Sequence, residues 1–136
     1  MIKMKIESHI RNLKESLDEI ADAIKQGIVN KQRTIGFHTS AACADMFEIL
    51  LHKKSLIPPD ILIKHEWFAS KNKINEKFRF EFDGKKEIVE MISEIERKRN
   101  ILCYGKPQRE EDLEKIIILF NQIKEKFKEL GLNEIE

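Results

Sequence analysis

The chain has 136 residues, of which 36% are charged and 41% hydrophobic, and its formal net charge is +1. This length suits one domain with a single core, and the near-zero charge excludes a global attraction to nucleic acid, so any basic patch must be local. Five glycines and three prolines leave little room for a turn-rich β architecture. No apolar run approaches the ~20 residues that span a bilayer, and no apolar signal-peptide core follows the N-terminus. We therefore expect one cytoplasmic domain over residues 1–136.

Two long amphipathic helices are expected in the first part of the chain. The first covers residues 6–28, where isoleucine and leucine recur at alternating steps of four and three residues, and Gly27 and Asn30 mark its end. The second covers about residues 31–54. Its first half, His38 to Ala44, is small and weakly polar, which lets a neighbouring helix approach closely. Basic and acidic residues alternate along the helices, which indicates solvated faces.

The connection between residues 55 and 84 is expected to be irregular. Pro58 and Pro59 close the second helix, and Asp60 is a good N-cap for a short helix through residues 61–68. Residues 78–82 alternate aromatic and charged side chains with the period of a strand. Since the chain offers no second strand, this stretch is either an extended flap over the bundle or an edge that pairs across a dimer.

The third long helix begins after Asp83-Gly84, and a charge interrupts its apolar seam. The seam runs at steps of four and three through Ile88, Ile92, Ile95, Arg99 and Leu102. Burying a guanidinium without a partner is costly, so Arg99 should meet an anion, a ligand or another chain. The alternative is an arginine at the edge of the core whose head group extends into water.

A fourth long helix opens after Pro107 with three acidic residues, and Gly131 ends it. Four long helices with short or moderate connections predict an all-α fold. The expected architecture is an antiparallel four- to five-helix bundle, with the irregular insertion between the second and third long helices.

Few residues carry recognisable chemistry. There is no glycine-rich phosphate loop and no metal-ligand spacing, so neither a cofactor nor a metal is expected. Cys43 and Cys103 are expected to be reduced packing residues, although the sequence alone leaves a disulfide open. Basic residues gather at the end of the third long helix, in Arg97-Lys98-Arg99, and continue in Lys106 and Arg109. Tyr104 lies among them, so this basic cluster suits a phosphate or an unstacked nucleotide base. The predicted phosphate-binding residues are Arg97, Arg99, Lys106 and Arg109.

The order of the long helices, the segment from Phe37 to Asp45 and the pair Arg99-Asn100 resemble the HEPN domain, the helical bundle of prokaryotic toxin–antitoxin and RNA-defence systems. In that family an Arg, often followed by a polar residue, precedes a His by four to six positions, and two such motifs meet at a dimer interface to form a metal-free ribonuclease site. Here the His position falls on Tyr104. A phenol with a pKa of ~10 is a poor base near neutral pH.

The resemblance therefore implies a homodimer that binds RNA or a nucleotide within a toxin–antitoxin or nucleotidyltransferase pair, with ribonuclease activity weak or lost. Two alternatives stay open. The first is an active metal-independent endoribonuclease in which His38 replaces the missing His, so that the candidate catalytic residues are Arg99, Asn100, Tyr104 and His38. The second is a structural dimerisation adaptor in which Arg99 only ties two subunits together. None of these functions requires a membrane.

Overall fold

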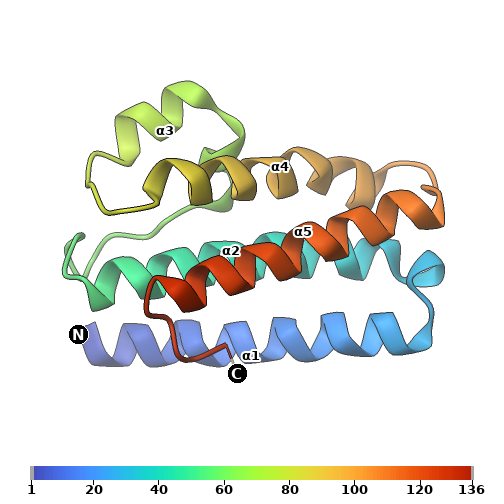
Figure 1. The fold of residues 1–136 in the computed structure, drawn as a ribbon, viewed down its shortest axis with the longest axis horizontal. Helices are drawn as coiled ribbons and strands as arrows, with labels where there is room; N and C mark the ends of the chain where they lie inside the picture. The colour runs from blue at the N-terminus through green and yellow to red at the C-terminus, as the bar shows by residue number, and fades with distance from the viewer. Residues whose placement is uncertain (1, 136) are drawn as a thin grey trace.

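The computed structural model describes residues 2–135 and the side chains of residues 6–135. Four long helices make up the body of the fold: α1 (Ile2–Gln26), α2 (Gln32–Lys53), α4 (Lys85–Tyr104) and α5 (Glu110–Glu129). Successive long helices run in opposite directions (Figure 1). The described residues contain no strand, so the all-α prediction is confirmed. None of the helices in this part of the chain is both long and apolar enough to cross a membrane.

Helix α2 is the central element of the bundle. It packs against α1 and α4 and also touches α5. Small residues of its first half, such as Ala42 and Cys43, are fully buried, and both cysteines are free thiols. At Gly36 the helices α2 and α4 approach so closely that an added Cβ would lie 2.5 Å from the Cβ of Leu102. A glycine is therefore needed where these two helices pack.

The connection between α2 and α4 departs from the expected structure at Asp60. Residues 61–64 are not helical; the next helical turn is η2 (His65–Ala69), a 3-10 helix that follows Lys64. The prediction of a short helix capped by Asp60 was therefore wrong. The physical reason is a competing partner, because the N–H of Ile63 donates to the buried carboxylate of Glu48 at 2.7 Å and ties this segment to α2.

A further helix, α3 (Lys71–Lys77), was not expected from the sequence. It begins at Ser70, whose side chain accepts a hydrogen bond from the N–H of Lys73 at 3.2 Å. Its only apolar residue is Ile74, so no hydrophobic periodicity marks it. A second 3-10 helix, η1 (Ile28–Lys31), joins α1 to α2.

Aromatic rings fold the rest of the connection onto α2. The ring of Phe47 on α2 lies 5.1–6.3 Å, between centroids, from those of Phe68, Phe78, Phe80 and Phe82. Contacts of this kind add about 0.5–1.5 kcal/mol each to the burial of the rings. The two charged residues between the last three rings are exposed, so the alternation in the sequence appears as aromatic rings that face α2 and charged side chains that face solvent, in a segment without regular secondary structure.

Candidate functional site

Arg99 lies against the first half of α2. Its guanidinium carbon is 5.1 Å from the centre of the Phe37 ring, and its Nη1 is 3.5 Å from Nε2 of His65. Its Nε is buried and has no hydrogen-bond partner among the described residues. No carboxylate of these residues forms an ion pair with Arg99. A cation therefore interrupts the apolar seam of α4. It stacks on an aromatic ring and has no direct ion-pair partner among the described residues.

His65 comes from the start of η2 and is held by a buried carboxylate. Its Nδ1 lies 2.7 Å from Oε2 of Glu96, and Oε1 of the same carboxylate accepts a hydrogen bond from the Ser40 hydroxyl at 2.7 Å. Glu96 is only 9% exposed. The tautomer that carries its hydrogen on Nδ1 suits the carboxylate of Glu96, and it leaves Nε2 as an acceptor toward the guanidinium of Arg99, which can only donate. Three separate elements thus place an oriented imidazole beside a guanidinium.

His38 makes different contacts from those of His65. Its Nδ1 lies 3.1 Å from the hydroxyl of Ser16 on α1, and its ring packs edge-on against Phe37, with centroids 4.9 Å apart. His38, Phe37 and His65 all line one groove of about 530 Å³ between α1, α2 and residues 62–66. Arg99 adjoins this groove through its contacts with Phe37 and His65.

An ion-pair cluster occupies the α1 side of the same groove. Nδ1 of His9 lies 2.8 Å from Oδ1 of Asp45, and its Nε2 contacts the carboxylate of Glu48, which also holds the N–H of Ile63. Burial opposes the charged ring, but the hydrogen bonds to Asp45 and Glu48 prevail and raise the pKa of His9 to about 9. Burial raises the pKa of Asp45, and its hydrogen bond with His9 offsets part of that rise. Within residues 6–135, no set of three or more His, Cys, Asp and Glu side chains could hold a metal ion.

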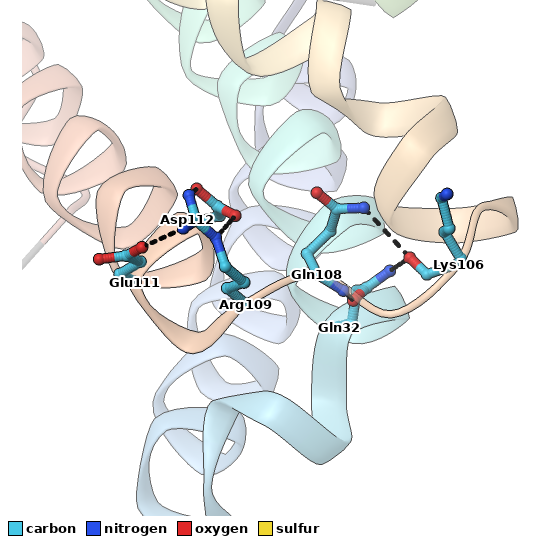
Figure 2. Close-up of polar contacts among 6 residues, drawn as sticks. All are labelled: Gln32, Lys106, Gln108, Arg109, Glu111 and Asp112. Atoms are coloured by element: carbon cyan, nitrogen blue, oxygen red, sulfur yellow. Dashed lines mark hydrogen bonds and ion pairs between the residues drawn. The ribbon is translucent and has the colours of Figure 1, made fainter.

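The four predicted phosphate-binding residues do not share one pocket. Arg97 and Arg99 are two positions apart, hence ~200° around α4, and Arg97 lines a groove beside α3 instead. The side chain of Arg109 is 73% exposed and pairs with Glu111 and Asp112 (Figure 2). The ammonium of Lys106 has no ion-pair partner in the part of the chain that the structure describes. Of the four, only Arg99 meets His65.

The loop that carries Lys106 is fastened by a side chain from α2. The amide nitrogen of Gln32 donates to the carbonyl of Lys106 at 3.1 Å, and its amide oxygen accepts from the N–H of Gln108 at 2.7 Å (Figure 2). A weaker contact of 3.4 Å reaches the carbonyl of Leu102. Gln32 therefore satisfies backbone groups at the end of α4 and in the turn that follows.

Asn100 and Tyr104 lie outside the Arg99–His65 contact. Both are exposed, Tyr104 by 75%, and they are four positions apart on one face of α4. Tyr104 is five positions after Arg99, which puts the two side chains ~140° apart around the helix. Sequence reasoning did not select His65, because it lies 34 positions before Arg99 in a segment without periodicity.

No protein-family model matches this chain, and no curated protein or solved structure matches it significantly.

Proposed function

We propose that the protein is a HEPN-like RNA-binding protein in which Arg99 and His65 bind a phosphodiester. The observation that carries the proposal is the contact between these two side chains, at 3.5 Å, in a site where no described carboxylate pairs with Arg99. A guanidinium presents N–H groups that match phosphate oxygens. The ring of Phe37, which is 45% exposed, adds a surface on which an unpaired base can stack.

The proposal includes the assembly that the family resemblance implies, a homodimer that acts with a toxin–antitoxin or nucleotidyltransferase partner. Large apolar side chains near the end of α4 support a surface that a second protein covers. Ile101 is 43% exposed and Tyr104 is 75% exposed, on the face of α4 that points away from the core. Light scattering should show a dimer at micromolar concentration in moderate salt, and a monomer would remove the dimer from the proposal.

Fluorescence anisotropy with a labelled single-stranded RNA tests the binding site. We expect the affinity to fall as salt rises, since Arg99 would displace counterions from the phosphates. Arg99→Ala should weaken binding by about tenfold or more, because a hydrogen bond to a charged group contributes about 1.5–3 kcal/mol. Arg11→Ala is the matched control, since Arg11 is exposed on α1. Unchanged affinity in Arg99→Ala, with the helical circular dichroism spectrum intact, would contradict the proposed site.

A second candidate function is metal-independent RNA cleavage, and the Glu96–His65 pair favours it. With Nδ1 held by Glu96 at 2.7 Å, Nε2 of His65 would take a proton from a ribose 2′-OH in place of its long contact with Arg99. The 2′-oxygen would attack the phosphorus, and Arg99 would stabilise the negative charge of the pentacovalent phosphorane. The bond from phosphorus to the 5′-oxygen would then break, and the protonated His65 would return its proton to that oxygen. His65 would supply the proton-transfer group that the sequence-based alternative assigned to His38.

Cleavage of the same RNA in EDTA distinguishes these functions. Cleavage that disappears in His65→Gln and persists in His38→Gln would establish the second candidate with His65 as the base. Cleavage that depends on His38 instead would support the alternative drawn from the sequence. Binding without cleavage would leave the proposed RNA-binding function, and a dimer that binds no RNA would favour the structural adaptor.

A further inference from the structure

A second groove lies between α3 and α4, on a different face of α4 from Arg99. Helix α3 packs on η2, and none of its Cα atoms comes within 8 Å of a Cα atom of α4. Figure 1 shows α3 standing clear of the first half of α4. The space between them is about 470 Å³, within the roughly 300–1,000 Å³ that is typical of sites for small ligands.

The wall that α4 contributes to the groove carries its charges in a fixed order. Four of the lining residues recur at steps of four, three and four, so they lie on one face of the helix: Lys86, Glu90, Ser93 and Arg97. The three charged side chains are exposed and form no ion pair with any described residue, whereas Lys85 and Glu81, which also line the groove, pair with each other at 3.0 Å. The wall therefore presents a cation, an anion and a second cation, and Glu90 and Arg97 are ~10.5 Å apart along the helix axis.

The floor of this groove is apolar, with two neutral polar groups above it. Phe68 and Val89 are buried and Ile74 is half-buried, so together they offer a hydrophobic surface. The hydroxyl of Ser93 is also buried and donates its hydrogen to the carbonyl of Val89, which leaves its oxygen able to accept. The amide of Asn75 is exposed and can both donate and accept. These two groups suit the N–H and carbonyl groups of a peptide backbone.

A further cation lies near Arg97. Lys71 lines the groove from the start of α3 and forms no ion pair with any residue that the structure describes. It follows η2 by two positions, and Arg97 follows Glu96, whose carboxylate contacts His65 of η2. The end of the groove next to η2 therefore carries two cations that are available to a ligand.

We propose that this groove binds a free tripeptide whose first residue is acidic and whose second residue is apolar. The charges of such a peptide follow the order that complements α4: a side-chain carboxylate, the terminal ammonium and the terminal carboxylate. The side-chain carboxylate pairs with Lys86, the ammonium contacts Glu90 one helical turn further on, and the apolar side chain covers the floor. The terminal carboxylate lies at Arg97 and Lys71. Three extended residues span about 10 Å, which matches the separation of Glu90 and Arg97.

Other ligands of similar charge leave part of the lining without a partner. An inorganic anion leaves the apolar floor uncovered. A fatty carboxylate covers the floor but offers no cation to Glu90 and no hydrogen-bond partner to Ser93 or Asn75. A single amino acid does not reach from Glu90 to Arg97, since one extended residue spans about 3.5 Å.

Isothermal titration calorimetry of the full chain with the peptide Glu-Leu-Ala tests this site. We expect saturable binding at peptide concentrations below about 5 mM. Glu90→Gln and Arg97→Gln should each reduce the affinity by about fivefold, the upper end for an ion pair that solvent still reaches. Glu94→Gln and Lys98→Gln are the matched controls, since both residues are exposed on α4 and do not line the groove.

An acetylated peptide shows whether Glu90 holds the ammonium. N-acetyl-Glu-Leu-Ala lacks this charge, so it should bind the wild type about fivefold more weakly than the free peptide does. In Glu90→Gln the two peptides should bind with equal affinity, because the partner of the ammonium is already absent. These titrations contain no RNA, and their variants leave Arg99 and His65 in place, so this proposal and the proposed function can fail separately.

Three results would overturn the proposal. The first is the absence of binding at peptide concentrations up to about 5 mM. The second is a similar affinity for inorganic phosphate or decanoate, which would remove the peptide as the class of ligand. The third is a loss of affinity in the control variants as large as in Glu90→Gln and Arg97→Gln, or an effect of acetylation that is the same in the wild type and in Glu90→Gln. Either form of the third result would place the peptide outside this groove.

Discussion

The charge on His9 should make the stability of the protein fall as the pH rises from neutral to alkaline. The ring lies between Asp45 and Glu48, and its pKa is raised from 6.5 to about 9 in the folded state. The folded protein therefore holds the proton more tightly than the unfolded chain does. The resulting stabilisation is complete below pH 6.5, declines as the pH rises through this window, and is lost above about pH 9.

The size of this loss follows from the change in pKa. A rise from 6.5 to about 9 corresponds to at most about 3.4 kcal/mol of stabilisation. Solvent screens part of the interaction, and the burial that raises the pKa of Asp45 costs free energy that the contact with His9 only partly offsets. We therefore expect the free energy of unfolding to fall by about 1–2 kcal/mol across the window.

Urea unfolding, followed by circular dichroism and by the fluorescence of Trp67, the single tryptophan, measures this loss. His9→Gln should be less stable than the wild type at pH 6.5, and the difference should shrink toward about pH 9. His38→Gln is the control, since His38 bonds to the Ser16 hydroxyl and not to a carboxylate. A wild-type stability that stays constant across this range, or the same slope in His9→Gln, would refute the reasoning.

Two further substitutions test the packing of α2 and its exposed ring. In urea unfolding, Gly36→Ala should lower the free energy of unfolding by about 1–3 kcal/mol, because the new Cβ would lie 2.5 Å from the Cβ of Leu102. Helix propensity alone would raise the free energy of unfolding by about 1 kcal/mol, and such a gain would contradict the close approach of α2 and α4. Phe37→Ala should weaken RNA binding in the anisotropy assay by about fivefold or more with little change in stability, since a stacked base contributes about 1–3 kcal/mol. Equal affinity of Phe37→Ala and the wild type would exclude stacking at this ring.

The long helices could be predicted from the sequence because apolar residues that become buried recur many times along them at helical spacing. The seam from Ile88 to Leu102 lies within α4, and its members are buried except for Arg99, which is half-buried. The connection before it offers no such repetition. Asp60 has the chemistry of a cap, but the contact between Glu48 and Ile63 decides the local structure, and no short-range pattern in the sequence reports that contact.

Of the two residues that make up the candidate site, only Arg99 could be predicted from the sequence. Arg99 stands out because a charge interrupts an apolar seam, and the structure brings it against Phe37. Its second contact, His65, depends on how the connection folds back. Acidic and basic residues alternate along the helices, which indicates solvent-exposed faces and gives no sign that Glu96 and Glu48 are buried. In the structure these two buried carboxylates contact His65 and His9. A buried carboxylate has the same sequence signature as an exposed one when its partner comes from a distant segment.

The contacts of Gln32 have a consequence for local opening of the fold. The N–H of Gln108 lies in a turn outside any helix, yet it donates to the Gln32 side chain at 2.7 Å. Its exchange with solvent deuterium should therefore be slow for a turn residue, because the amide becomes accessible only when the first turn of α2 moves away from it. The turn between α4 and α5 and the start of the central helix would then open together, as one cooperative unit of hydrogen exchange.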